Sequence, residues 1–268
     1  FAARPDDRGQ LGAQVELADL KAPFLAIDAG GSGDVAKALA LLQGSPLGPQ
    51  LGSQFMQLSG HGPADFSVRL RLPTQDVEAR DYVVRAKLKS VTADWPVLRA
   101  VATRVTGDLE IHNLEISAPS LRGVILDGPF ELNVRPGPVG GQVSASVLLS
   151  GSGRASGAPL PAVIGLPDAI RMSGSTEWRL NGRIERRGTG EQWPSSIEIV
   201  SNLAGLGIDA PSPFAKPAAD LRPTRVLIDV PVRGRTELRI DSGAARAALA
   251  FTERADQRWL LERGAARF

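Results

Sequence analysis

Apolar and polar residues alternate along most of this chain, and this period of two restricts its fold more than any other feature. In the run DFSVRLRLP, Phe66, Val68 and Leu70 fall on one side, and the residues between them are polar. Successive side chains of a β-strand point to opposite faces, so the pattern predicts strands with one dry face and one wet face. Similar runs continue to ALAF near residue 251.

Turn-forming clusters separate these runs. Examples are SGHGPAD, RPGPVGG and ERRGTGEQ, spaced as in an antiparallel meander. We expect roughly a dozen or more short strands. They should form one continuous unit over residues 1–268, because no low-complexity linker divides the chain. A sheet of that size must curl, close or split into two layers. The expected fold is mainly β: an elongated, strongly curled antiparallel sheet forming an open hydrophobic groove.

Three segments depart from the alternation and predict short helical insertions. In DVAKALALLQGSP, Asp34 is a suitable N-cap and Gly44 with Pro46 a suitable stop, which predicts a helix near 34–43. The Pro-rich apolar stretches near 158–168 and 212–219 predict small helical caps on the sheet.

Composition excludes several classes of protein. The chain has no Cys, which rules out disulfides and thiolate metal sites, and its formal net charge is +2 with Arg spread over many segments, which argues against nucleic-acid binding. No apolar run approaches the ~18 residues of a membrane-spanning helix, and the first residues do not resemble a signal peptide. We therefore expect a segment of a longer protein.

The sequence indicates no enzyme, cofactor or metal site. His61 and His112 lie in a Gly-rich turn and on a strand, without the spacing of a metal motif, and no GxSxG elbow is present. The run DAGGSGD (28–34) resembles a phosphate-binding loop but lacks its Lys-Ser/Thr, so we interpret it as a tight turn that requires glycine at positive φ.

Alternation alone does not say what covers the dry face. A second sheet could bury it, as in a β-sandwich, or the face could stay open to a ligand. The pattern leaves both alternatives open.

Three segments resemble the YhdP-type members of the AsmA-like family of envelope lipid-transport proteins. They are ADLKAPFLAIDAGGSGDVAKALALLQGSPLG, MSGSTEWRLNGRI and SNLAGLGIDAPSPFAKPAADLRPTRV, which lie in the same order as in that family. The resemblance implies a periplasmic protein of the Gram-negative envelope, anchored in the inner membrane when full-length. It also implies a β-groove linked to phospholipid transport between the inner and outer membranes and to outer-membrane homeostasis.

On this interpretation the chain is a non-enzymatic conduit segment that shields phospholipid acyl chains. Its expected partners are those chains, neighbouring repeats of the full-length protein and other envelope proteins, with no nucleic acid. The residues that we expect to line the groove, assigned by alternation, are Phe66, Val68, Leu70, Val84, Ala86, Leu88, Leu109, Ile111, Val143, Ala145, Val147, Trp178, Leu180, Ile197, Ile199, Val226, Ile228 and Val230. The alternative is a structural or adaptor β-domain that scaffolds envelope partners through its edge strands.

Overall fold

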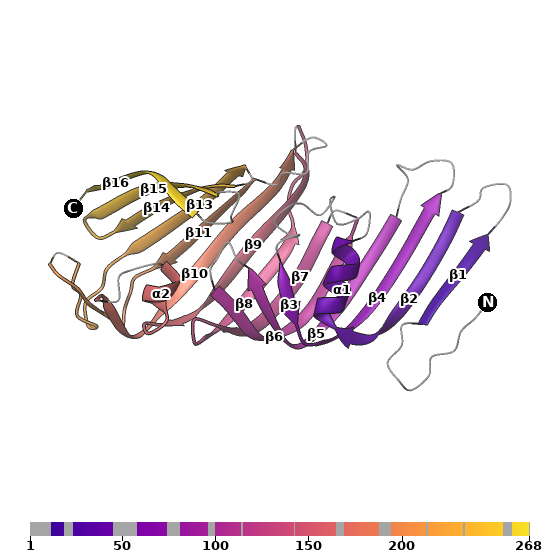
Figure 1. The fold of residues 1–268 in the computed structure, drawn as a ribbon, viewed down its shortest axis with the longest axis horizontal. Coiled ribbons are helices and arrows are strands. Elements are labelled where there is room, and N and C mark those ends of the chain that lie inside the picture. The colour runs from indigo at the N-terminus through magenta and orange to yellow at the C-terminus, as the bar shows by residue number, and fades with distance from the viewer. Residues whose placement is uncertain are drawn as a thin grey trace.

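One antiparallel sheet of 16 strands forms most of the protein (Figure 1). The structure, a computed structural model, describes residues 12–18, 24–44, 58–73, 81–95, 100–113, 115–141, 143–164, 169–187, 194–212, 214–232, 234–253 and 259–267. The strands of the first half are β1 (Gly12–Ala18), β2 (Phe24–Asp34), β3 (Ser59–His61), β4 (Pro63–Pro73), β5 (Asp81–Trp95), β6 (Ala100–His112), β7 (Glu115–Ile125) and β8 (Gly128–Pro136). Those of the second half are β9 (Val143–Ser156), β10 (Arg171–Arg187), β11 (Ser195–Ser201), β12 (Leu206–Asp209), β13 (Thr224–Val232), β14 (Arg235–Ser242), β15 (Ala245–Glu253) and β16 (Trp259–Arg267).

Nearly every strand pairs with its neighbour in the chain. The order across the sheet is β1-β2-β4-β5-β6-β7-β8-β9-β10-β11-β13-β14-β15-β16, while β3 pairs with the end of β5 and β12 with the start of β10. Strands β1 and β16 lie at the two ends of this order and do not pair with each other, so the sheet is open. The prediction of a mainly β, antiparallel fold is confirmed.

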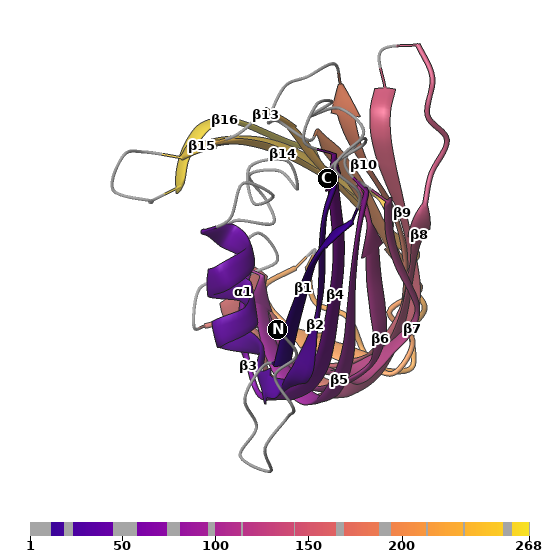
Figure 2. The ribbon, with the colours of Figure 1, turned by 90° about the vertical axis from the view of Figure 1, so that its right-hand side faces the viewer.

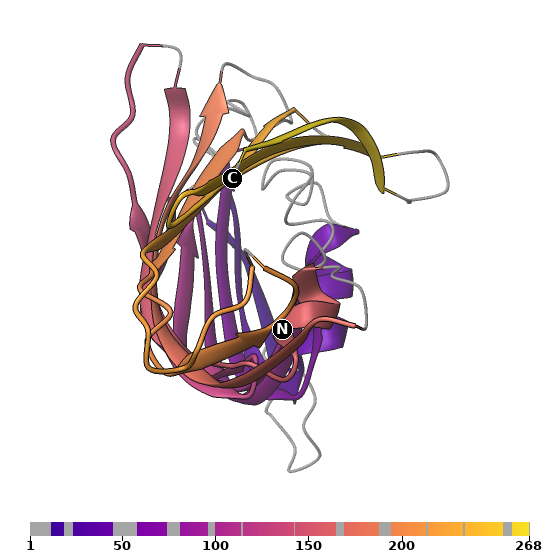
Figure 3. The same ribbon diagram turned by 90° about the vertical axis from the view of Figure 1, so that its left-hand side faces the viewer.

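The sheet curls about its long axis. Figures 2 and 3, which view the molecule from its two ends, show the strands following an open arc with a concave and a convex face. Register shifts between β5 and β6, at Leu88/Val91 and Val91/Ala93, break the regular ladder, and Ser90 there has a φ of 62°. Such bulges bend a strand and increase its local twist, which contributes to the curl.

Helix α1 (Val35–Gln43) follows β2 and lies on the concave side of the sheet (Figure 2). Asp34 caps it by accepting hydrogen bonds from the backbone N–H of Ala36 at 2.8 Å and of Gly62 at 2.9 Å. These two donors hold the pKa of the Asp34 carboxyl below its ordinary value, the Gly62 bond being the stronger cause. The helix ends at Gly44, as predicted.

The interpretation of DAGGSGD as a tight turn is wrong. Strand β2 continues through these residues and pairs with β4, from Asp28 opposite Arg69 to Asp34 opposite Pro63. Gly30 and Gly33 are not among the glycines with positive φ. The glycine-rich run is therefore extended backbone that leads directly into α1.

The other two expected helical insertions differ from one another. Helix α2 (Leu160–Ile164) is a short helix between β9 and β10, within the expected stretch 158–168. The described residues near 212–219 instead form turns and an isolated bridge between Ile208 and Lys216. The Lys216 ammonium, on a side chain that is 2% exposed, donates to the carbonyl oxygens of Leu206 at 2.8 Å and Pro217 at 3.0 Å, and so holds this segment against β12.

The core consists of apolar clusters on the concave face. One joins Val35 of α1 to Ala64, Val91 and Val105, with Phe66 and Leu88 packed against them. Another gathers around Ala118, Val134, Ala145, Val147 and Leu149 in the middle of the sheet. Because α1 packs on the same face as these residues, the dry face predicted from the sequence is the concave one.

Candidate functional site

An apolar surface runs across the concave face from strand to strand. In the N-terminal half, Val68 of β4 lies opposite Val84 of β5, which lies opposite Ile111 of β6. A second row joins Phe66 to Ala86 and Ala86 to Leu109. Directly opposed residues of an antiparallel pair share a face, so these predicted dry residues lie together.

The same surface continues through the C-terminal half. Leu180 of β10 lies opposite Ile199 of β11, and Ile199 lies opposite Val226 of β13. Ile197 and Ile228 form the next row, which continues to Leu238 and Leu249. The cluster around Ala118, Val134 and Val147 lies between these two sets of rows. We call the concave-face residues of the rows and of this cluster the apolar band.

The predicted residues differ in how deeply they are buried. Ala86, Ile111, Ala145, Val147 and Ile197 are buried, and the remaining residues of the predicted lining are half-buried. Val143 lies at the margin, because a register shift between Arg186 and Arg187 places it opposite Arg187. Most of the band thus keeps part of its surface exposed.

Helix α1 covers only the N-terminal part of the band. Its Val35 and Leu39 pack over Ala64 and Val91, and its Leu42 packs against Tyr82 and Ile111. All strands of the described residues belong to one sheet, so the band faces α1 there rather than a second sheet of a sandwich.

Glycines within the band leave room for large neighbours. A Cβ on Gly153 would lie 2.6 Å from the Trp178 ring and 2.6 Å from the carbonyl oxygen of Pro129. The Trp178 ring therefore lies over Gly153, its partner across β9 and β10. A Cβ on Gly182 would approach Leu149 and Ile197 at 3.2 and 3.4 Å, so the band is closely packed in this row.

Two polar atoms of the band are buried without a hydrogen-bond partner in the part of the chain that the structure describes. They are the Tyr82 hydroxyl and the Trp178 indole Nε1. A buried donor without a partner costs about 1–3 kcal/mol. Burial raises the pKa of Tyr82 to about 12, and the positive charge of Arg186 opposes this rise. Sequence analysis did not identify Tyr82 or Arg186 as site residues.

The convex face carries ion pairs between directly opposed residues. Arg69 and Asp28 are 2.9 Å apart, Arg122 and Glu131 3.0 Å, and Arg154 and Glu177 3.6 Å. Each pair joins adjacent strands in register. Such opposed pairs of unlike charge stabilise neighbouring strands on the wet face.

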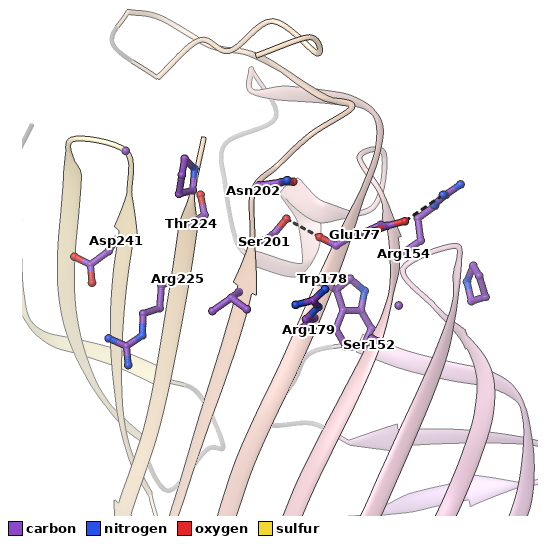
Figure 4. Close-up of a pocket in the computed structure, with 15 residues that line it drawn as sticks. Ser152, Arg154, Glu177, Trp178, Arg179, Ser201, Asn202, Thr224, Arg225 and Asp241 are labelled. Atoms are coloured by element: carbon purple, nitrogen blue, oxygen red, sulfur yellow. Dashed lines mark hydrogen bonds and ion pairs between the residues drawn. The ribbon is translucent and has the colours of Figure 1, made fainter. Parts of the chain in front are cut away.

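A pocket of about 1090 Å³ lies across β8 to β14 (Figure 4). Its charged side chains lie on the convex face, as do the ion pairs described above. Arg154 and Glu177 point toward one another, and the Ser201 hydroxyl donates to the Glu177 carbonyl oxygen at 2.7 Å. Arg225 pairs with Glu198, and Asp241 lies 3.5 Å from Arg246. Trp178 is the single residue of the predicted lining that borders this pocket.

Neither histidine belongs to a metal-binding cluster among the described residues. The two histidines lie apart: His61 is on β3, and His112 on β6 lies 3.0 Å from Asp81 in an exposed pair. No group of three or more His, Asp or Glu residues that could hold a metal ion occurs among the described residues. The apolar band is therefore the main candidate for function.

The fold and the band define a class of protein: an open, curled antiparallel sheet with a continuous apolar concave face. Residues 10–268 match the family model described as YhdP protein, and the chain belongs to the YhdP family. This family is associated with the cell envelope and with lipid transport rather than catalysis. No curated protein and no solved structure matches the chain. Among the described residues, no helix is both long and apolar enough to span a membrane.

Proposed function

We propose that this chain is a conduit segment that binds phospholipid acyl chains on the apolar band and shields them from water during transport between the inner and outer membranes. The observation that carries this proposal is the continuity of the band on the concave face. Its rows cover β4 to β6 and β10 to β15, and the cluster around Ala118, Val134 and Val147 joins them across β7, β8 and β9. The same proposal places the segment in the periplasm, within a longer protein anchored in the inner membrane.

The physical reason is the cost of exposing acyl chains to water. Each CH₂ exposed costs ~0.8 kcal/mol, so one chain of about sixteen carbons faces a barrier on the order of 10 kcal/mol. An aliphatic surface removes most of this barrier. The band is rich in Val, Ile, Leu and Ala, which offer no hydrogen bonds and no preference for a particular chain.

The half-buried state of the band supports a guest at this surface. Val84, Leu180 and Val226 are neither buried nor fully exposed. An acyl chain lying along them would cover apolar area that the protein itself leaves in contact with water. In the proposed function, seventeen of the eighteen predicted lining residues contact the lipid or support residues that contact it. The exception is Val143, which lies at the margin of the band.

Site-specific photocrosslinking tests the proposal. A photoreactive amino acid at Val84, on the concave face of β5, should crosslink to phospholipid in cells, while the same group at Val83 should not. Val83 is the matched control because it is adjacent, similarly half-buried and on the opposite face.

Lipid extraction from the purified chain provides a second measurement. We expect co-purifying phospholipid by mass spectrometry. The absence of phospholipid, together with equal crosslinking from Val83 and Val84, would contradict the proposal and favour a scaffold that binds envelope proteins through its edge strands.

A further inference from the structure

The pocket beside Arg154 and Glu177 lies on the side of the sheet opposite to the apolar band. It has a volume of about 1090 Å³, and its lining comes from β8 to β14. Ser152 of β9 lies opposite Glu131, which takes part in a convex-face ion pair, so Ser152 also points to the convex face. Arg179 of β10 lies directly opposite Ser152 and therefore shares that face.

One row of the lining crosses five neighbouring strands. From Arg179 it continues through Val200 of β11 and Arg225 of β13 to Asp241 of β14, each directly opposite the residue before it. Strands lie about 4.8 Å apart, so this row measures roughly 19 Å from β9 to β14. The pocket is therefore long enough for a ligand much larger than a single ion.

Arg179 keeps its charge unpaired inside the pocket. Glu177, two residues earlier on the same face, lies 3.6 Å from Arg154, and Glu198 on β11 pairs with Arg225. The carboxylates beside Arg179 are thus held by other arginines. Among the described residues, Arg179 has no ion-pair or hydrogen-bond partner, and its side chain is exposed. Its guanidinium can therefore donate to a ligand in the pocket.

The charge of the lining indicates what kind of anion fits. Three arginines, Arg154, Arg179 and Arg225, face two carboxylates, Glu177 and Asp241, which gives the pocket a net charge of +1. A singly charged carboxylate group balances this charge. A phosphate dianion would exceed it and would be repelled by the two carboxylates of the lining.

Neutral polar groups complete the lining around Arg179. The Ser152 hydroxyl has no hydrogen-bond partner among the described residues, and it lies on the strand next to Arg179. The Asn202 side-chain oxygen accepts from the backbone N–H of Ala204 at 3.0 Å, which leaves its NH₂ group as a donor. Together with the carboxylates of the lining, these groups offer both donors and acceptors, as the hydroxyl groups of a sugar require.

We propose that this pocket binds an acidic sugar, whose single carboxylate is held by Arg179 and Ser152 and whose hydroxyl groups contact the remaining polar lining. The Arg179 guanidinium donates two parallel N–H bonds to the carboxylate, and the Ser152 hydroxyl donates one more. The site is independent of the proposed function, because it lies on the face opposite to the apolar band. It gives this segment a means of attachment to a carboxylated glycan.

Two sugars that differ only in charge test this inference. Methyl glucuronide should bind about three to five times more tightly than methyl glucoside, as expected for one charged contact that is partly exposed to solvent. NMR titration of the chain labelled with ¹⁵N in arginine measures both affinities. The Nε–H resonance that is missing from Arg179→Gln identifies Arg179, and it should shift with the glucuronide and not with the glucoside.

Substitutions separate Arg179 from the other arginines of the convex face. Arg179→Gln should bring the two affinities to within about 1.5-fold of each other. Arg183→Gln is the matched control, because Arg183 is on the same strand and face, opposite Ser196, and pairs with Glu185 outside the pocket. It should retain the full preference. Glu177→Gln should increase the preference about twofold, because it removes a repelling carboxylate and frees Arg154.

Several results would overturn the sugar site. Equal binding of the two sugars to the unmodified chain would do so, as would equal effects of Arg179→Gln and Arg183→Gln. If sodium acetate binds as tightly as methyl glucuronide, the pocket is a general anion site and the sugar assignment is wrong. Tighter binding of a short peptide that contains one Asp would assign the pocket to a peptide instead.

A separate measurement keeps this inference apart from the proposed function. Hexadecylglycerol, an uncharged lipid with one alkyl chain, should bind to the apolar band equally well in the unmodified chain and in Arg179→Gln. Failure of hexadecylglycerol to bind either chain would contradict the proposed function alone. Failure of methyl glucuronide to bind would contradict the sugar site alone.

Discussion

Tyr82 of β5 and Arg186 of β10 lie at the same edge of the concave face, and the charge of Arg186 acts on the Tyr82 phenol across four intervening strands. In a flat sheet, strands lie about 4.8 Å apart, so such a separation would place the two backbones roughly 24 Å from each other. The relationship therefore depends on the curl and on the length of both side chains.

The ionisation of Tyr82 provides a first prediction. Its pKa should be about 12, since burial disfavours the phenolate, and Arg186→Gln should raise it further because a stabilising positive charge is removed. An alkaline titration followed by the ¹³Cζ resonance of the single Tyr checks both. A pKa near the ordinary value of 10 would show that the ring is solvated.

The same group makes stability depend on alkaline pH. The folded-state pKa of Tyr82 is raised, so its contribution is fully present below pH 10 and is lost as pH rises from 10 towards 12. Tyr82→Phe should remove that part of the loss, which urea unfolding at several pH values would measure. An unchanged pH profile in Tyr82→Phe would contradict the prediction.

The cap of α1 predicts the opposite dependence at acid pH. The folded-state pKa of Asp34 is lowered below its ordinary 3.8, so its stabilising effect is present above that pH and is lost as pH falls through the folded value. Asp34→Asn should lower the thermal unfolding midpoint at pH 7 and reduce its dependence on pH below about 4. Asp108→Asn on β6, a carboxyl outside this cap, serves as the control and should retain the acid dependence of the unmodified chain.

Leu206 of β12 should be a major contributor to stability. Its side chain is 2% exposed, and Leu206→Ala should lower the free energy of unfolding by about 2–5 kcal/mol through the cavity that it leaves. Leu221→Ala is the control, since Leu221 is 67% exposed and its loss should change this free energy by less than about 0.5 kcal/mol. Equal effects in urea unfolding would mean that the segment after β11 is not packed as described.

Two adjacent alanines of β15 test the apolar band in its C-terminal half. Ala247 lies opposite Ile240 on the concave face, and Ala248 lies opposite Arg239 on the convex face. Ala247→Asp should lower the affinity for hexadecylglycerol at least about tenfold, because an acyl chain there would desolvate the carboxylate. Ala248→Asp should leave it unchanged. Equal affinities in the two variants would indicate that lipid does not reach β15.

The sequence predicts the faces of the strands well, because alternation depends on local geometry alone. The rows from Val68 to Ile111 and from Leu180 to Val226 follow the predicted alternation. Their role in lipid binding stays a prediction. The helix at 35–43 was also predictable, since Asp34 and Gly44 are local capping signals.

Features that depend on strands distant in sequence were not predictable. The run 28–34 has the composition of a turn, yet pairing with β4 keeps it extended. The approach of Arg186 to Tyr82 requires the curl, and the pocket beside Arg154 and Glu177 depends on how several strands twist together. Alternation gives the face of each residue but neither the curvature of the sheet nor the distances across it.

Because nearly all strands pair with their neighbours in the chain, the sheet is built almost entirely from successive hairpins. Adding or removing one hairpin between existing ones would lengthen or shorten the molecule by roughly 10 Å without disturbing contacts elsewhere. A protein of this design can therefore change its length in evolution in steps of one hairpin.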